Sequence, residues 1–293
     1  MSETIHLLTL PDYWPWFLLV LGLVVGSFLN VVIYRLPIML ENQWQQEAWG
    51  ILHPDDEPPS TKPFNLLLPP STCPHCQHKI RFWENIPVLS YLFLRGRCSQ
   101  CQTAISIRYP IIELSAGLLA LLSAMVYGPG WAAVLVCIFL WTLLAMSMID
   151  VDHQLLPDSL TLPLIWLGLL VNTTGMFASL ESAVLGAVAG YLSLWSVYWL
   201  FKLATGKEGM GYGDFKLLAA LGAWMGWQYL PLIILLSSLV GAVVGIGMVV
   251  IRGRDRNIPI PFGPYLAAAG ILALFYGDRL IEGYLQMTTG VTI

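Results

Sequence analysis

Eight apolar stretches follow one another along the chain, and most are long enough to cross a bilayer as a helix, which takes roughly 20 apolar residues. Hydrophobic residues make up 57% of the chain and charged residues only 11%, and the mean hydropathy is +0.69. We therefore predict an all-α polytopic membrane protein in a lipid bilayer. Its eight transmembrane helices are expected at residues 15–34, 110–127, 131–149, 159–177, 182–203, 215–229, 231–251 and 262–281.

Basic residues orient these helices, because Lys and Arg are retained on the cytoplasmic side. Of the 14 Lys and Arg residues, seven lie in 35–108, three in 202–216 and three in 252–256, which leaves Arg279 as the exception. The three basic segments share one side only if the short sixth stretch also crosses. We therefore expect both ends of the chain, including the N-terminus, on the periplasmic side.

This topology divides the chain into three parts. We expect an N-terminal transmembrane helix at 1–34, a cytoplasmic loop at 35–109 and a seven-helix membrane core at 110–293. The loop has room for one small module. The formal net charge of −4 provides no basic excess, so we expect no nucleic acid among the partners.

Four cysteines in the loop form two close pairs, Cys73 with Cys76 and Cys98 with Cys101. This spacing is close to that of two knuckles that hold one tetrahedral Zn²⁺ with four thiolates. The cytoplasm keeps cysteines reduced, so four cysteines in a cytoplasmic loop favour metal binding over disulfides. The sequence therefore predicts a structural zinc site, since four protein ligands leave no position for substrate. Iron fits the same spacing, and disulfides would require an inverted topology.

Acidic residues flank the predicted helices at the inner membrane face, where carboxylates are costly and often functional. Asp150 ends the third helix, and Asp214 follows a glycine-rich run, 209–213, at the start of the sixth. Two neighbouring carboxyl groups can share one proton, so that one acts as base and the other as acid toward water. The pair Asp150 and Asp214 is therefore a candidate for metal-free peptide hydrolysis.

Other interpretations of these acids remain open. Asp152 competes with Asp150, and both Asp158 and Asp214 are residues of the type that caps a helix N-terminus. A proton-coupled transporter would also use membrane carboxylates, although transporters usually place them near the bilayer midplane. A scaffold of a secretion machine would need none of them.

The chain resembles the bifunctional type IV prepilin leader peptidases/N-methyltransferases, a family of membrane-embedded aspartic proteases. The resemblance covers nearly the whole chain. It rests on residues 26–37, the four cysteines, and residues 84–87, 95–98, 108–113, 149–158, 211–214 and 261–263, the last two including the Gly-Tyr-Gly-Asp run and a Pro-Phe-Gly run.

The resemblance implies an aspartic endopeptidase of the bacterial inner membrane with Asp150 and Asp214 as the catalytic pair. Prepilins and pseudopilins would be its substrates, cut between a short basic leader and an apolar helix at the cytoplasmic face. The resemblance further implies N-methylation of the new N-terminus with S-adenosylmethionine, and it associates Gly96 with that activity. A turn glycine in the cysteine loop is the other interpretation of Gly96, and a peptidase without methylation is the other interpretation of the chain.

Overall fold

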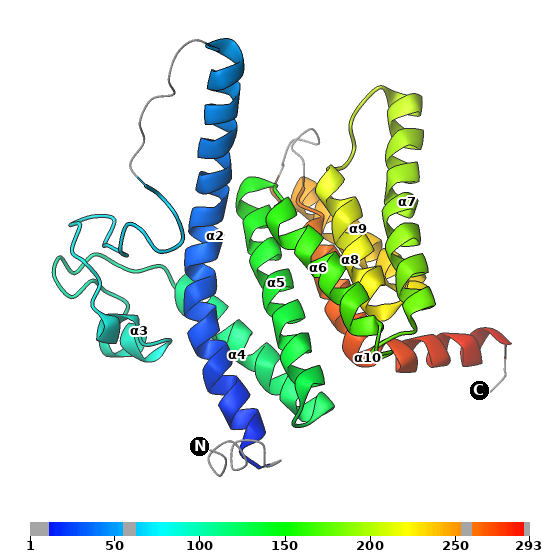
Figure 1. Ribbon diagram of the computed structural model, residues 1–293, viewed down its shortest axis with the longest axis horizontal. Coiled ribbons are helices and arrows are strands. Elements are labelled where there is room, and N and C mark those ends of the chain that lie inside the picture. The colour runs from blue at the N-terminus through cyan, green and yellow to red at the C-terminus, as the bar shows by residue number, and fades with distance from the viewer. Residues whose placement is uncertain (1–11, 55–62, 253–259, 290–293) are drawn as a thin grey trace. The chain divides into compact units, whose positions relative to one another are not determined.

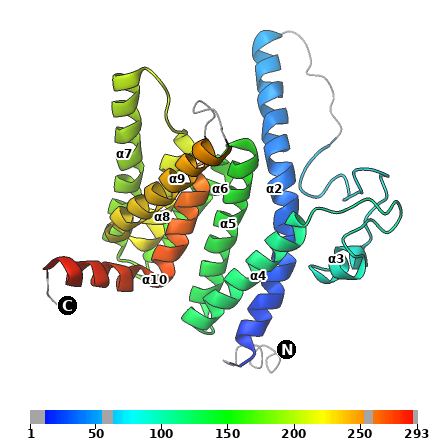
Figure 2. The ribbon, with the colours of Figure 1, turned by 180° about the vertical axis from the view of Figure 1, so that it is seen from behind.

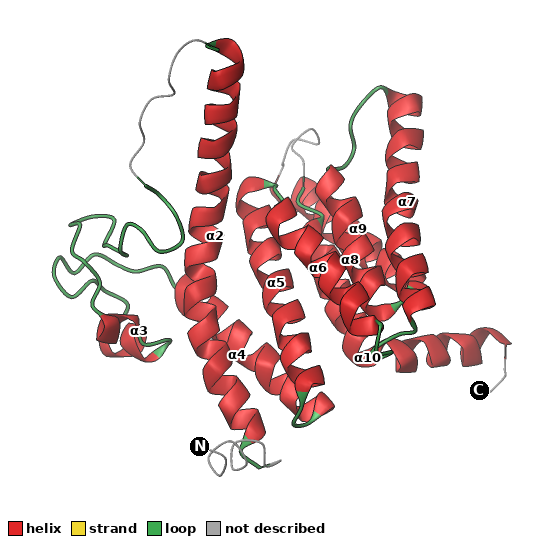
Figure 3. Ribbon diagram, in the orientation of Figure 1, coloured by secondary structure: helices red, strands yellow, loops and turns green. Residues whose placement is uncertain are grey.

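The computed structural model describes residues 12–54, 63–252 and 260–289, and helices are the regular secondary structure within them. Within these ranges there is no β-strand, only two isolated bridges, Thr72 with Lys79 and Arg97 with Ala104 (Figure 3). The helices in chain order are α2 (Trp14–Leu52), η1 (Phe82–Asn85), α3 (Leu89–Phe93), α4 (Arg108–Tyr127), α5 (Trp131–His153), α6 (Asp158–Asn172), α7 (Leu180–Thr205), α8 (Tyr212–Met225), η2 (Trp227–Tyr229), α9 (Leu230–Arg252) and α10 (Gly263–Thr289) (Figure 1).

Five of the described helical segments are long enough and apolar enough to cross a membrane: Trp14–Leu52, Arg108–Tyr127, Trp131–His153, Leu180–Thr205 and Trp227–Met248. The chain is therefore a multi-pass membrane protein by length and composition. The other three expected segments are also helical, but α6 has only 15 residues, α8 has 14, and α10 extends to Thr289. The third basic cluster, at 252–256, lies almost wholly outside the described residues.

The first helix is longer than expected. The sequence analysis ends it at residue 34 and begins a loop there, whereas α2 continues to Leu52. Residues 38–49 contain no glycine or proline and are rich in Gln and Glu, which favour helix. Most side chains from 41 to 52 are exposed, so this part of α2 is a polar extension of an apolar helix.

The chain divides into two compact units, Met1–Trp141 and Thr142–Ile293, and the division falls within α5. In the first unit, α4 crosses α2 (Figure 2). Glycines allow the two backbones to meet, because a methyl group on Gly26 would lie 2.7 Å from Glu113 Cα. The Trp141 indole, from the middle of α5, donates a 3.0 Å hydrogen bond to the Ala116 carbonyl.

The loop between α2 and α4 is fastened to both helices. Buried Arg35 donates hydrogen bonds to the carbonyl oxygens of Asn65 (2.9 Å) and Pro69 (2.6 Å). Asn30 Nδ2 donates to the Tyr109 carbonyl at 3.2 Å. The first two contacts hold the loop against α2 at the level of Arg35, and the third joins α2 to the start of α4.

In the second unit, α8 is surrounded by other helices. It packs against α6, α7 and α10, and every residue from Leu217 to Met225 is buried. Small residues allow a close approach here, since Gly186 of α7 and Gly222 of α8 face one another so closely that neither has room for a side chain. Asn172 Nδ2 satisfies the last carbonyls of α8 by donating to Ala223 and Trp224, each at 2.9 Å.

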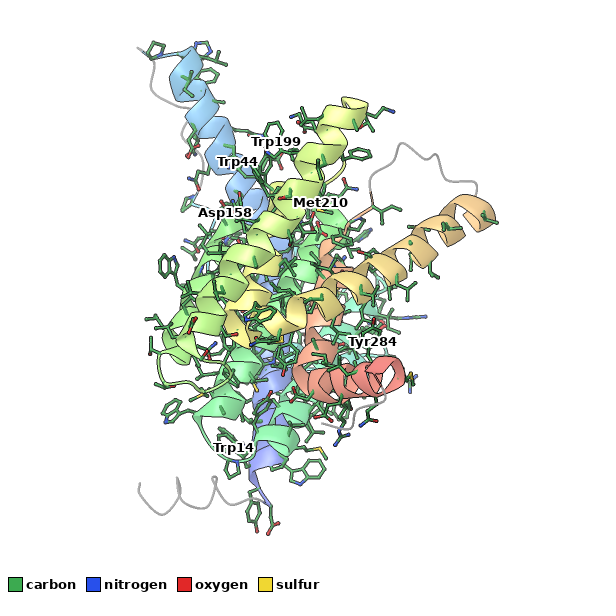
Figure 4. All side chains as sticks on the ribbon, turned by 90° about the vertical axis from the view of Figure 1, so that its right-hand side faces the viewer. Trp14, Trp44, Asp158, Trp199, Met210 and Tyr284 are labelled. Atoms are coloured by element: carbon green, nitrogen blue, oxygen red, sulfur yellow. The ribbon has the colours of Figure 1, made fainter. Side chains whose placement is uncertain are left out.

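The labelled side chains show which residues lie at each end of the two units, taken one at a time. In the first unit, Trp14 lies near one end of α2 and Trp44 toward the other (Figure 4). In the second unit, Asp158, Trp199 and Met210 lie toward one end and Tyr284 toward the other (Figure 4). The residues around Asp150 and Asp214 therefore belong to the same end of the second unit as Asp158.

Candidate active site and metal centre

Asp150 lies in the last turn of α5 with its side chain inside the second unit. Only 5% of the residue is exposed. The backbone N–H of Gly263, at the start of α10, donates a 2.9 Å hydrogen bond to Asp150 Oδ2. A methyl group on Gly263 would lie 2.7 Å from the same oxygen, so only glycine lets the backbone come this close. The carboxyl group is thus held in one orientation by an element 113 residues away in sequence.

Asp214 lies in the first turn of α8 and is 7% exposed. The N-cap of α8 is Gly211, so the capping interpretation of Asp214 is wrong. A carboxylate in the first helical turn is nevertheless favoured by the partial positive charge of the helix N-terminus. A methyl group on Gly211 would meet nothing closer than Asp214 Oδ2, at 3.8 Å, so the backbone before the helix leaves the carboxyl group approachable.

The fold brings these two carboxyl groups together. They are near enough for Asp150 to act electrostatically on Asp214. Leu156 packs against the glycines that neighbour the two acids. A methyl group on Gly213 would lie 2.7 Å from Leu156 Cβ, and one on Gly263 would lie 3.1 Å from Leu156 Cδ2. Two carboxyl groups in such a place do not both ionise readily, which is the condition for a proton-sharing pair.

The competing aspartates lie elsewhere. Asp152 is exposed in the last residues of α5. Asp158 is the first residue of α6, not its N-cap, which is Pro157. Both Asp158 oxygens accept hydrogen bonds from Lys216 Nζ, at 2.6 and 2.7 Å. The capping role expected for Asp158 is therefore replaced by an ion pair that joins α6 to α8.

The loop before Asp214 is held by a second ion pair. Lys202, in the last turn of α7, donates to Glu208 Oε1 at 2.8 Å and to the Tyr198 hydroxyl at 3.2 Å. The rings of Tyr198 and Tyr212 lie 5.3 Å apart between centroids. Side-chain contacts thus hold the residues on both sides of the glycine-rich run, whereas the glycines have no side chains to make such contacts.

The four cysteines gather in the first unit, and their sulfur atoms all lie within 4.8 Å of one another. The Sγ atoms of Cys73 and Cys101 are 3.8 Å apart, and those of Cys76 and Cys98 are 3.9 Å apart. A tetrahedron with metal–sulfur bonds of about 2.3 Å has edges of about 3.8 Å. The four thiols therefore fit one metal ion in tetrahedral coordination.

The two cysteine pairs have the same backbone turn. Gln77 and Gln102, each next after the second cysteine of its pair, have positive φ angles of 58° and 59°. Their N–H groups donate to the carbonyls of Cys73 and Cys98, at 2.9 and 3.1 Å. This repetition, which the cysteine spacing alone does not reveal, shows two knuckles of equal geometry facing a common centre.

Comparison with known proteins agrees with the geometry. Residues 20–127 match the family model described as "Bacterial Peptidase A24 N-terminal domain", and residues 137–246 match the one described as "Type IV leader peptidase family". The chain belongs to the type IV leader peptidase family. No solved structure matches it.

Relatives in this family are similar along almost their whole length. A protein of Stutzerimonas stutzeri is 63% identical over 92% of this chain and 92% of its own. Proteins of Pseudomonas aeruginosa (60% identical, 92% of each chain) and Aeromonas hydrophila (58%, covering 93% and 94%) are similar to the same degree. All three are named "Prepilin leader peptidase/N-methyltransferase".

The loop histidines of this family member are not metal ligands in the described geometry. His75 is exposed, and His78 Nε2 lies 3.2 Å from Glu84 Oε2. A backbone hydrogen bond from Arg81, with further contributions from Ser99 and His78, lowers the pKa of Glu84 to about 2. Glu84 therefore fastens the segment after the first knuckle as a carboxylate.

Gly96 has a geometry that only glycine satisfies. Its φ angle is +66°, and a methyl group there would lie 2.8 Å from the Tyr91 hydroxyl oxygen. Its N–H donates to the Tyr91 carbonyl (2.8 Å), and its carbonyl accepts from Ile105 N–H (2.7 Å). The turn-glycine interpretation thus has a complete structural basis, while the association with methylation stays a prediction.

The structural roles of two residues, Glu113 and Gly263, were not found by the sequence analysis. Glu113, buried in α4, accepts a 2.7 Å hydrogen bond from Val88 N–H, and Ser27 of α2 also bonds to its side chain. Gly263 is the other residue without a predicted role. Both lie within segments that carry the family resemblance, but no spacing rule indicates what they contact.

Proposed function

We propose that this protein cleaves the leader peptides of prepilins and pseudopilins with Asp150 and Asp214, and then methylates the new N-terminus. The observation that carries the proposal is the pair of buried, interacting carboxyl groups in the part of the chain that belongs to the leader peptidase family. The names of the relatives support both activities.

The proposed hydrolysis needs only water and the two acids. The ionised carboxylate takes a proton from water as the water oxygen attacks the scissile carbonyl carbon, and the protonated partner donates its proton to the carbonyl oxygen. Collapse of the tetrahedral intermediate breaks the C–N bond, and the leaving amine takes up a proton. Which aspartate begins as the base stays open, because a coupled pair titrates as a unit.

The substrate is expected to lie extended beside Gly211 and Gly213. A peptide bond within a helix is shielded by its own hydrogen bonds, so the scissile bond must leave the helix before attack. Gly211 and Tyr212 are exposed beside Asp214, and the absence of a side chain at Gly211 leaves room for an extended backbone. The apolar part of the substrate would remain in the bilayer.

The proposed topology has eight spans, with the N-terminus periplasmic and the active site facing the cytoplasm of a bacterial inner membrane. The distribution of Lys and Arg supports this orientation. The short helices α6 and α8 fit as spans because neighbouring helices, not lipid, cover most of α8. We retain as parts of this topology an N-terminal span at 1–34, a cytoplasmic loop at 35–109 and a membrane core at 110–293.

We propose that the four cysteines bind one zinc ion with a structural role. Soft thiolate ligands in a tetrahedron suit zinc, and four protein ligands leave no open position for catalysis. Iron uses the same donor set, so metal analysis of the purified protein is the measurement that separates the two.

Methylation would use S-adenosylmethionine, which supplies an electrophilic methyl group to the unprotonated N-terminal amine. The residues gathered around Asp150 and Asp214 do not by themselves mark a donor site. We assign Gly96 to this activity through the shape of its turn, which sets the course of the chain between Tyr91 and Ile105.

The deciding experiment is cleavage of one purified prepilin by the protein in detergent. Asp150→Asn and Asp214→Asn should each abolish cleavage, while Asp152→Asn, a matched change on the same helix, should leave it near the original rate. Wild-type cleavage by either of the first two variants, with normal thermal unfolding, would remove the pair from the mechanism. A transporter or a scaffold would leave the prepilin uncut by the unmodified protein as well.

A further inference from the structure

The cysteine module exposes an apolar surface next to the membrane helices. Six large hydrophobic residues between 82 and 93 are at least 44% exposed, and two of them exceed 80%. We call this set the α3 surface: Phe82, Trp83, Ile86, Leu89, Leu92 and Phe93. Exposed apolar patches of this kind in a small module mark a surface that another molecule or a membrane covers.

The α3 surface lies at membrane depth within the first unit. Glu113, whose side chain binds Val88 N–H just before α3, is five residues beyond Arg108, or about 7.5 Å along the axis of α4. Its other partner, Ser27, lies on α2 well before Arg35. Arg35 and Arg108 are the basic residues that border the two spans, so α3 begins deeper than both. Figure 2 accordingly shows α3 beside α2 and α4 and not beyond their ends.

Basic residues flank this apolar surface in the sequence. Lys79, Arg81, Arg95 and Arg97 are all exposed, and Glu84 is the one acidic residue between 63 and 107. The guanidinium carbon of Arg81 lies 5.4 Å from the centre of the Trp83 ring. The module therefore carries an excess of positive charge in a chain whose net charge is −4. Apolar side chains bordered by cations are the pattern of a segment that inserts into an anionic leaflet.

We propose that the α3 surface is inserted in the membrane leaflet that faces the cysteine module, with its four cations at the phosphates of anionic phospholipids. The proposal rests on α2 and α4 spanning the bilayer, not on the peptidase activity. Anchored at this depth by Glu113, the module lies against the leaflet instead of standing free in water. The metal site would then hold a membrane-bound element in shape, which gives a four-thiolate site a reason to exist in a membrane enzyme.

The test uses the full-length protein in nanodiscs with a photoreactive benzoylphenylalanine in place of Phe93, which is 84% exposed. The matched control carries it in place of Ile51, which is 81% exposed on the polar extension of α2. After irradiation, intact mass should show lipid adducts at position 93 and none at position 51. Adducts at 93 to other residues of the chain or to added prepilin, in place of lipid, would overturn the proposal.

A second measurement tests the lipid class. Hydrogen exchange of the amides in 82–94 should be slower in phosphatidylglycerol nanodiscs than in phosphatidylcholine nanodiscs. The variant Lys79→Gln with Arg81→Gln should lose this difference while keeping its zinc content and its cleavage activity. Equal exchange of the unmodified protein in the two lipids would overturn the assignment to anionic phospholipid.

Discussion

The amide of Gly263 and the carboxyl group of Asp150 are joined by a 2.9 Å hydrogen bond that connects the start of α10 to the end of α5. The bond orients one member of the proposed pair from outside the segments that carry the two aspartates. It depends on the absence of a side chain at Gly263, because a methyl group there would lie 2.7 Å from the bonded oxygen.

Replacement of Gly263 by alanine should therefore displace Asp150 without removing any catalytic group. A misplacement of about 1 Å can cost about 100-fold in rate, and we expect a loss of cleavage of that order. Gly283→Ala on the same helix is the control, because a methyl group there has no neighbour within 4 Å. Cleavage kinetics in detergent measure the effect, and an unchanged rate in Gly263→Ala would show that the hydrogen bond does not orient the acid.

The ion pair between Asp158 and Lys216 should have a small effect. Asp158→Asn removes one charge of a partly exposed pair, which is worth about 0.2–1 kcal/mol, so we expect a fall in cleavage of about fivefold at most. The exchanged pair Asp158→Lys with Lys216→Asp should recover most of the rate. A loss as complete as that of Asp150→Asn would instead place Asp158 among the catalytic acids.

Removal of the metal ligands should empty the metal site. We expect about one zinc ion per chain by elemental analysis, and loss of that zinc in the variant Cys73→Ser with Cys98→Ser. Cys137→Ala is the control, since Cys137 is buried in α5 far along the chain from the knuckles. An equivalent of iron, or zinc retained without the two thiols, would contradict the assignment.

Glu113 should affect methylation more than cleavage. Glu113→Ala leaves the partly buried Val88 N–H without its acceptor, at a cost of about 1 kcal/mol, and loosens α3, whose Tyr91 contacts Gly96. Glu113→Gln keeps an acceptor oxygen and should behave nearly as the unmodified protein. Mass spectrometry of the product N-terminus gives the methylated fraction. An equal decline of both activities in Glu113→Ala would mean that the contact supports only the fold.

The helical content could be predicted, because apolar length is a local property of the sequence. Asp150 and Asp214 could be chosen as candidates from the cost of carboxylates near lipid, but it is the family resemblance that implies their role as a pair. The cysteine cluster could be predicted because the spacing of its four cysteines is also a local property of the sequence. The roles of Gly263 and Glu113 could not, since each depends on a backbone N–H from a distant segment. A sequence pattern does not indicate which backbone N–H group the fold will bring to a given carboxyl group.

The misjudged elements have physical reasons too. The sequence analysis ends the first helix at residue 34, just before the first basic residue, but helix propensity continues to the region of Gly50. Asp158 was interpreted as a cap from its residue type, whereas the nearby Lys216 offers a charged partner. In each case the structure is determined by a property that the sequence rule did not take into account.

The burial of α8 from Leu217 to Met225 has a consequence for how the protein is made. A segment of 14 residues, about 21 Å long and carrying Lys216 and Asp214, is a poor candidate for release into lipid alone as it leaves the ribosome. It is stable in the bilayer only when it packs against α6 and α7, which are synthesised before it. The active site would thus be completed late in biogenesis, so that a nascent chain interrupted before α10 holds an aspartate pair still lacking the amide that orients it.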